Sequence, residues 1–220
     1  YDLLIIFMKE IKICIAGNFN IAIECSVFLL KKYKNIKIYA LLNQNDKGID
    51  TFQNSYKKFC KKSKIKIIDL DNAKRIKNLI FFSLHFDKII ETQKFLTTRF
   101  YNIHFSLLPK YKGMHTTAWP ILNGENRSGV TLHEIDDGID TGRIIDQYVF
   151  QIDENDNAEK VFLKYITTGI KIFKSNIEKI INNNYKSYNQ SKTNSSYYSK
   201  NSINFKKYKI NFNKTAFEIH

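Results

Sequence analysis

The chain has 220 residues, of which 43% are hydrophobic, and it carries a formal net charge of +14. This length suits one large domain, or one domain with a small appendage, and the apolar fraction is enough for a sizeable core. Every apolar run is broken by Lys, Asn or Asp well before the roughly 20 residues of a membrane-spanning helix, so we expect no membrane segment. The lysine excess is compatible with binding of polyanions. Because Lys, Asn and Ile are abundant throughout the chain, we expect no nucleic-acid partner, and a phosphorylated small substrate suits the charge.

The N-terminus and the cysteines add little to the functional picture. Residues 1–7 are apolar but too short to span a bilayer, and Met8 is typical of a natural start, so we leave residues 1–7 out of fold reasoning. Cys14, Cys25 and Cys60 are scattered and share no metal-ligand spacing. They predict reduced thiols, a cytoplasmic location and no metal site.

The first half of the chain alternates strand-like and helix-like segments. Strands separated by helices of this length are typical of a parallel sheet with helices on its faces. In chain order we expect a strand at 11–16, a helix at 21–32, a strand at 36–42, a helix at 51–62, and strands at 65–68 and 79–84.

The second half continues with strands and ends in a long helix. Residues 158–181 carry apolar side chains at helical spacing and predict the clearest amphipathic helix of the chain. Before it we expect a strand at 100–104, a loop at 106–113, a short helix at 118–122, strands at 129–135 and 143–151, and a turn-rich loop at 136–142.

The composition shifts after residue 181. Residues 182–204 are rich in Asn, Ser, Tyr and Lys with little apolar periodicity, which predicts a linker or a loosely tethered arm. Residues 205–212 alternate weakly, and 215–220 resemble the start of a helix. We therefore predict an α/β fold, with a Rossmann-like, mostly parallel twisted sheet and flanking helices over residues 8–181. A linker and the start of a C-terminal subdomain would occupy residues 182–220.

Three polar residues form a candidate site. Asn102 and His104 are two apart in an expected strand, so their side chains project from the same face at its C-terminal end, where open α/β sheets bind ligands. Asp140 lies in a Gly-rich loop that could fold back over them. A capping or solvent-facing role fits the Asn-x-His pair as well. Asp136 and Asp137 are as plausible as Asp140 on spacing alone.

Together the three residues suit acyl transfer to an amine. A protonated His and an Asn amide can donate hydrogen bonds to a tetrahedral oxyanion, each contributing on the order of 3 kcal/mol. A nearby carboxylate favours the charged imidazole and can accept the proton that the amine must lose. No Ser or Cys nucleophile is needed, because the substrate amine attacks directly.

A longer pattern around these residues resembles the folate-dependent formyltransferase family. Residues 102–113 read Asn-Ile-His-Phe-Ser-Leu-Leu-Pro-Lys-Tyr-Lys-Gly, residues 129–133 read Gly-Val-Thr-Leu-His, and residues 137–142 read Asp-Gly-Ile-Asp-Thr-Gly. The resemblance covers roughly residues 9–181, with a fainter echo at 209–219. It implies that Asn102, His104 and Asp140 are catalytic and that the formyl donor is 10-formyltetrahydrofolate.

The resemblance also implies where the folate binds. The segment 83–90 would receive the pterin ring through its backbone and apolar side chains, and the loop 135–140 would close the other side. Without the family these positions would be ordinary strand-end residues. The implied folate contacts are Phe86, Asp87, Lys88, Ile89, Ile135 and Asp136.

The acceptor follows from differences within the family. Members that formylate initiator tRNA usually carry Trp-Arg-Gly-Ala-Pro after Leu-Leu-Pro, whereas residues 111–120 here read Tyr-Lys-Gly-Met-His-Thr-Thr-Ala-Trp-Pro. Purine-pathway members usually have Pro after the catalytic His, where this chain has Phe105. The segment looks like members that formylate dTDP-linked amino-dideoxy sugars, of the dTDP-4-amino-4,6-dideoxyglucose type, for bacterial surface polysaccharide such as O-antigen. The sequence leaves open whether the 3- or the 4-amino group is formylated.

A nucleotide-linked sugar needs cations for its diphosphate and a flat surface for its base. Lys110, Lys112 and His115 could serve the first need, and Tyr111 or Trp119 the second by stacking, although core packing explains Trp119 equally well. The turn after the first expected strand lacks the full Gly-rich fingerprint, so we predict no NAD site. The expected acceptor contacts are Asn18, Lys110, Tyr111, His115, Thr116 and Trp119.

Other readings stay open from the sequence. The same three residues could formylate methionyl-tRNA, a purine intermediate or another amine, or hydrolyse the formyl folate. A basic nucleic-acid-binding protein with an inactive site is a further alternative. Family members with a second domain continue past a segment that resembles residues 209–219, and dimer contacts of sugar formyltransferases often lie in this region. A homodimer is therefore an expectation that stays open.

Overall fold

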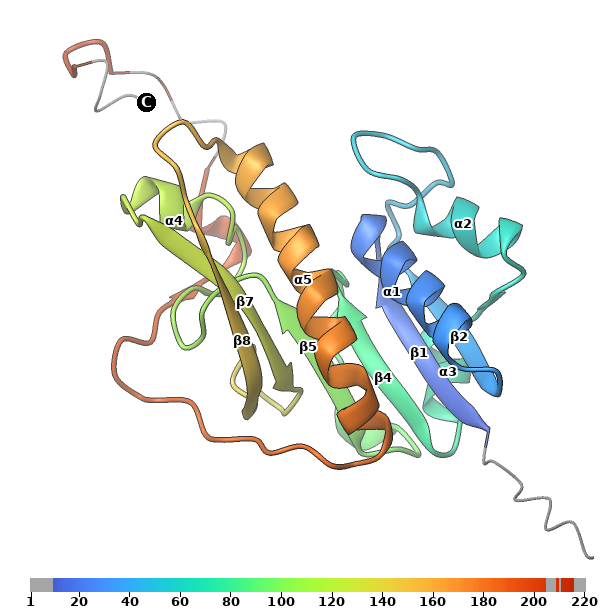
Figure 1. The fold of residues 1–220 in the computed structure, drawn as a ribbon. Helices are drawn as coiled ribbons and strands as arrows, with labels where there is room; N and C mark the ends of the chain where they lie inside the picture. The colour runs from blue at the N-terminus through green and yellow to red at the C-terminus, as the bar shows by residue number, and fades with distance from the viewer. Residues whose placement is uncertain (1–9, 205–208, 210, 216–220) are drawn as a thin grey trace, which may run out of the picture.

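A twisted seven-stranded sheet forms the centre of the protein in the computed structural model, which describes residues 10–204, 209 and 211–215 (Figure 1). The strand order is β3-β2-β1-β4-β5-β7-β8, with β1 to β5 parallel and β7 and β8 antiparallel. The predicted α/β fold with a mostly parallel sheet is confirmed. The strands are β1 (Ile11–Gly17), β2 (Ile36–Leu42), β3 (Lys66–Ile67), β4 (Leu79–Leu84), β5 (Arg99–His104), β7 (Arg127–Glu134) and β8 (Ile144–Gln151).

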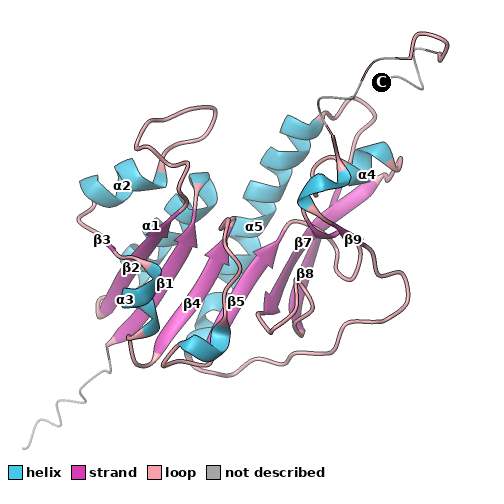
Figure 2. Cartoon of the chain, turned by 180° about the vertical axis from the view of Figure 1, so that it is seen from behind, coloured by secondary structure: helices cyan, strands magenta, loops and turns pink. Residues whose placement is uncertain are grey.

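Helices cover both faces of the sheet. Figure 1 shows α1 (Phe19–Lys32) and α5 (Ala158–Ile181) side by side across one face, and Figure 2 shows α3 (Leu70–Lys74) on the other. Shorter elements complete the fold, namely α2 (Tyr56–Lys62), α4 (Trp119–Leu122), the 3-10 turns Thr92–Lys94 and Lys200–Ser202, and the small parallel pair β6 (Lys112–Gly113) and β9 (Tyr197–Tyr198).

The core is divided between the two faces of the sheet. Along β1, Ile13 and Ile15 belong to the larger cluster with residues of α1 and α5, whereas Cys14 and Ala16 belong to a smaller cluster on the opposite face. A central parallel strand is buried on both faces, which explains its nearly continuous apolar sequence. The helix over 158–181 has the predicted bounds and is capped by Asn157, whose side chain accepts the backbone N–H of Lys160 at 2.9 Å.

One predicted helix is shorter than expected. The helix expected over 51–62 begins only at Tyr56, because Ser55 caps it and accepts the backbone N–H of Lys58 at 3.0 Å. Asp50 in turn accepts the backbone N–H of Ser55 at 2.9 Å, and this contact stabilises a loop in place of the first helical turn. Residues 51–55 therefore belong to a loop.

Residues 182–204, for which we expect a linker or loosely tethered arm, are anchored to the sheet. In Figure 1 this segment leaves the lower end of α5, passes the ends of β7 and β8, and turns upward to α4. Tyr188 exchanges backbone hydrogen bonds with Ile144 at 2.8 and 2.9 Å, and Ile203 is buried. The predicted boundary at residue 182, between a catalytic domain and a C-terminal linker and subdomain, stays a prediction. Most of the weak alternation over 205–212 and of the expected helix start at 215–220 lies outside the described residues.

Within the described part of the chain, no helix is both long enough and apolar enough to cross a membrane.

Candidate active site

The structure brings the three predicted catalytic residues together. Asn102 and His104 lie at the C-terminal end of β5, and Asp140 reaches them from the loop between β7 and β8. The Oδ1 atom of Asp140 lies 3.2 Å from Nδ2 of Asn102, and its Oδ2 atom lies 3.4 Å from Nδ1 of His104. The backbone N–H of Gly113 also donates to Oδ2 at 2.9 Å. The carboxylate therefore lies between the amide and the imidazole, and it is mostly buried.

Opposing effects set the protonation of this pair. Burial lowers the pKa of His104 below its ordinary value, although Asp140 and the Tyr111 carbonyl partly counteract it. Burial would raise the pKa of Asp140, but the positive charge that His104 carries when protonated and the Gly113 N–H outweigh it and hold the pKa below the ordinary range. The carboxylate is therefore ionised at neutral pH, and burial favours the neutral form of the imidazole beside it.

His104 makes a second contact on its other ring nitrogen. Its Nε2 atom lies 2.8 Å from the carbonyl oxygen of Tyr111, and because a carbonyl only accepts, Nε2 carries a proton. Tyr111 has a left-handed backbone with φ 58°. The loop after residue 106 thus covers His104 and occupies the hydrogen-bond donor that a substrate oxygen would use.

His133 is a further site residue, to which the sequence reasoning assigns no role. It pairs with Asn102 across β5 and β7, and its Nε2 atom lies 3.1 Å from Nδ2 of Asn102 and 3.6 Å from Oδ1 of Asp140. Its Nδ1 atom lies 2.6 Å from the carbonyl oxygen of Glu134, so Nδ1 carries a proton, and in the tautomer protonated there alone Nε2 accepts from Asn102. The sequence did contain a signal for His133, because this residue ends the motif at 129–133 that carries part of the family resemblance.

This arrangement changes the expected role of Asn102. Its Nδ2 atom faces two acceptors, Nε2 of His133 and Oδ1 of Asp140. The opposite orientation of the amide would place an oxygen against a carboxylate, which is repulsive. The side chain therefore turns its Oδ1 acceptor away from both, instead of offering the hydrogen-bond donor that we expect for an oxyanion.

The predicted folate positions of the first segment follow the end of β4. The backbone N–H of Asp87 donates to Oδ1 of Asn43 at 3.2 Å, and Nδ2 of Asn43 donates to the carbonyl of His85 at 3.0 Å. Asn43 thereby fixes this turn. Phe86 packs against the smaller core cluster. Lys88 and Ile89 are exposed, and Ile89 retains 73% of its accessible surface.

The second predicted folate segment follows β7. Ile135 is half-buried, and its backbone N–H donates to the carbonyl of Phe100 at 2.9 Å. Asp136 is exposed, and its Oδ1 atom accepts the N–H of Gly138 at 3.1 Å and the hydroxyl of Thr141 at 2.6 Å. Asp136 thus shapes the loop that carries Asp140, whereas Asp140 alone of the loop carboxylates contacts Asn102 and His104 among the described residues.

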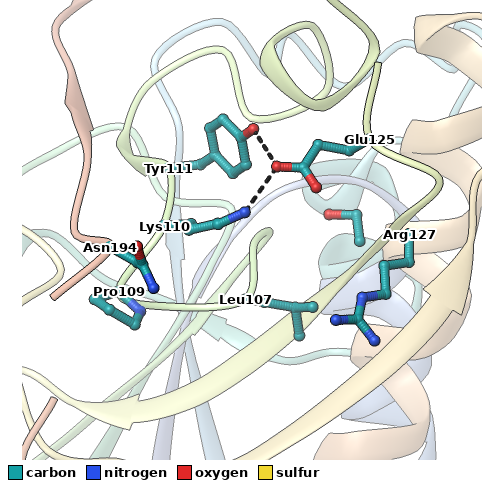
Figure 3. Close-up of a pocket in the computed structure, with 8 residues that line it drawn as sticks. Leu107, Pro109, Lys110, Tyr111, Glu125, Arg127 and Asn194 are labelled. Atoms are coloured by element: carbon teal, nitrogen blue, oxygen red, sulfur yellow. Dashed lines mark hydrogen bonds and ion pairs between the residues drawn. The ribbon is translucent and has the colours of Figure 1, made fainter. Parts of the chain in front are cut away.

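Two of the predicted acceptor residues line a cavity of about 270 Å³. Figure 3 shows the Lys110 ammonium and the Tyr111 hydroxyl directed at Glu125, at 2.9 and 2.8 Å from its Oε1 atom. Tyr111 lines this cavity and also contacts His104 through its carbonyl, so the cavity lies next to the candidate catalytic residues. Asn102, His104 and Asp140 do not themselves line the cavity. Its remaining lining residues are Leu107, Pro109, Arg127, Ser128 and Asn194.

The other predicted acceptor residues contact several parts of the chain. Trp119 stacks on Tyr198 with ring centroids 4.0 Å apart, which occupies one of its faces. The Nε2 atom of His115 lies 2.9 Å from the carbonyl of Lys200, and the carbonyl of Thr116 accepts the Tyr165 hydroxyl at 3.0 Å. Asn18 caps α1 by accepting the backbone N–H of Phe19 at 2.9 Å and donates to Asn45 at 3.4 Å.

Solved structures resemble this chain closely. One is WlaRD, a sugar 3N-formyl transferase determined in the presence of dTDP and 5-N-formyl-THF. It is 53% identical with a TM-score of 0.88, and the match covers 96% of this chain and 77% of that one. Another is an N-formyltransferase from Helicobacter canadensis in complex with folinic acid and dTDP-3-aminofucose. It is 48% identical with a TM-score of 0.89, over 95% of this chain and 78% of that one.

Curated relatives match over shorter stretches. The bifunctional polymyxin resistance protein ArnA of Wigglesworthia glossinidia brevipalpis is 32% identical over 133 residues, which are 60% of this chain and 20% of that protein. A methionyl-tRNA formyltransferase of Thermodesulfovibrio yellowstonii is 42% identical over 79 residues, 36% of this chain and 26% of that protein. The matches thus span about a fifth to a quarter of the length of these two relatives. The profile of the Formyl transferase family matches residues 42–177, and the chain belongs to that family.

Proposed function

We propose that this protein transfers a formyl group from 10-formyltetrahydrofolate to the amino group of a dTDP-linked amino-dideoxy sugar. The observation that carries the formyl transfer is the Asp140 carboxylate, buried between Asn102 and His104. The choice of acceptor is supported by the two solved relatives, one in the presence of dTDP and 5-N-formyl-THF, the other in complex with folinic acid and dTDP-3-aminofucose.

His104, Asn102 and Asp140 each have a separate role in the proposed formyl transfer. The amine attacks the formyl carbon, a C–N bond to the sugar forms, and the bond from carbon to the folate nitrogen breaks. The Nε2–H group of His104, which donates to the Tyr111 carbonyl in this structure, would donate to the developing oxyanion instead and stabilise that oxyanion. The Oδ1 atom of Asn102 accepts a hydrogen of the amine and orients it. The ionised Asp140 partly offsets the effect of burial on the pKa of His104, and the proton that the amine loses passes to the departing folate nitrogen.

We propose the 3-amino group as the position that is formylated. The relative named a sugar 3N-formyl transferase is 53% identical, and the complex with dTDP-3-aminofucose is 48% identical. A solved 4-N formyltransferase from Francisella tularensis is only 20% identical and supports the fold alone. The regiochemistry of the two similar relatives therefore favours a 3-amino sugar over the 4-amino type that we expect from the sequence.

An acceptor panel tests this proposal. The protein is incubated with 10-formyltetrahydrofolate and, in separate reactions, dTDP-3-aminofucose, a dTDP-4-amino sugar, methionyl-tRNA or no acceptor, and products are followed by mass spectrometry. We expect a formylated product with the 3-amino sugar at the highest kcat/KM. A higher kcat/KM with methionyl-tRNA would identify tRNA as the acceptor instead of the sugar. Deformylation of the folate without any amine would indicate a hydrolase.

Further details of the proposal concern the cellular role. The reaction would take place in the cytoplasm, in keeping with three buried free cysteines, and its product would enter surface polysaccharide such as O-antigen of lipopolysaccharide. A homodimer would be the active form. Light scattering on the purified protein measures that state, and a monomer with full activity would contradict it.

A further inference from the structure

Gln190 contacts the loop that carries Asp140 from a part of the chain where we expected only a linker. Its Nε2 atom donates to the carbonyl oxygens of Asp140 and Gly142, both at 2.8 Å. The reverse orientation would place Oε1 against two carbonyl oxygens, so the observed one is the favourable orientation. Both hydrogens of one amide are thus committed to the backbone on either side of Thr141.

The backbone at this point needs such a partner. Asp140 has φ 54°, in the left-handed region that a residue with a Cβ atom adopts at a cost. Gly142 lies so close to β7 that an added Cβ atom would be 1.7 Å from the carbonyl oxygen of Glu134. The chain therefore takes a tight path over residues 140–142, and the path decides where the Asp140 carboxylate points.

The segment around Gln190 is held in place by other contacts. Tyr188 pairs with Ile144 through two backbone hydrogen bonds, and Arg143 donates to the Ser187 hydroxyl at 2.9 Å and to Oδ1 of Asn189 at 2.8 Å. In Figure 1 the segment passes the ends of β7 and β8 that the loop connects. The side chain of Gln190 can therefore be changed while the segment stays attached.

We infer that Gln190 is a positioning residue for formyl transfer, which fixes the backbone of residues 140–142 so that the Asp140 carboxylate reaches Asn102 and His104. The inference rests on the proposed function, in which Asp140 acts on His104. Gln190 then belongs to the active site, because its amide orients the carboxylate. If Gln190 only attached segment 182–204 to the sheet, removal of its amide would leave the Asp140 carboxylate in place.

The test compares Gln190→Leu, which keeps the size of the side chain and removes its donors, with Asn189→Ala, which removes a neighbouring contact to Arg143. We expect kcat of Gln190→Leu for formyl transfer to dTDP-3-aminofucose to fall about 100-fold, since misplacement of about 1 Å can cost that factor, while both KM values change little. Asn189→Ala should keep the wild-type kcat. Equal kcat values for wild type and Gln190→Leu would overturn the inference.

A double variant separates positioning from general damage. In single-turnover reactions with excess enzyme, Gln190→Leu should cause no further loss in an Asp140→Asn background, because its effect passes through the carboxylate. An equal loss in both backgrounds would overturn the inference. A crystal structure of Gln190→Leu gives a readout independent of activity. We expect the Asp140 carboxylate to leave the Gly113 N–H, and an unmoved carboxylate would contradict the role. Absence of transfer by the wild type would refute the proposed function and leave this structural result standing.

Discussion

His133 and Asn102 face each other across adjacent antiparallel strands, with Nε2 of the imidazole 3.1 Å from Nδ2 of the amide. The contact fixes which end of the amide is available to a substrate. Because Nδ2 of Asn102 also donates to Oδ1 of Asp140 at 3.2 Å, the Oδ1 atom of Asn102 is the acceptor left for a substrate. In the proposed reaction the position of the amine before attack would then depend on His133, which orients Asn102.

Removing the His133 acceptor should slow the reaction. In His133→Phe one amide hydrogen of Asn102 loses its partner, so the amide can turn from the orientation that the amine needs, and kcat should fall roughly tenfold. In His133→Gln the side-chain Oε1 atom can accept in place of Nε2, so kcat should be higher than in His133→Phe. Steady-state kinetics with each variant measure the difference. Identical kcat values in wild type and His133→Phe would show that the contact does not position Asn102.

The pH dependence of stability should report the buried His104. Its folded-state pKa lies below the ordinary value of 6.5, so the unfolded chain binds more protons between these two values. The free energy of unfolding should therefore fall as the pH decreases from about 6.5. His104→Asn should remove this part of the dependence. Urea unfolding of both proteins from pH 7 to pH 5 measures it, and an equal dependence in both would contradict the assignment.

Gly142→Ala should destabilise the protein more than Gly124→Ala. A Cβ atom at residue 142 would lie 1.7 Å from the Glu134 carbonyl oxygen, whereas residue 124 has open space around it and only a positive φ of 63°. We expect a loss of unfolding free energy of about 1–3 kcal/mol or more at residue 142 from steric conflict, and about 1–2 kcal/mol at residue 124 from its left-handed backbone. Denaturant unfolding measures both. A smaller loss at residue 142 would mean that the loop is free to move.

Sequence periodicity predicts the elements that are held by apolar packing. The bounds of β2, β4 and α5 agree with the structure, because each buries a regular set of side chains. The start of α2 was wrong by five residues, since the contacts of Asp50 and Ser55 stop the helix and leave no periodic signal. The antiparallel pairing of β7 and β8 could not be read from their composition.

The same limit applies to the site. Asn102 and His104 are found from strand periodicity, and Asp140 is selected among neighbouring carboxylates by the family motif. His133 faces Asn102 only once β5 and β7 are known to pair. Gln190 lies in a polar segment without apolar periodicity, and its amide contacts Asp140, which lies 50 residues earlier in the sequence. Such contacts depend on the fold and not on a local pattern.

The transfer rate of Asp140→Asn, compared with that of Asp137→Asn, tests the central claim most directly. Asp137 is an exposed carboxylate in the same loop, which spacing alone could not distinguish from Asp140. With 10-formyltetrahydrofolate and dTDP-3-aminofucose, we predict that kcat falls about 10³-fold in Asp140→Asn and is unchanged in Asp137→Asn. Equal activity in the two variants would contradict formyl transfer through the buried Asp140 carboxylate.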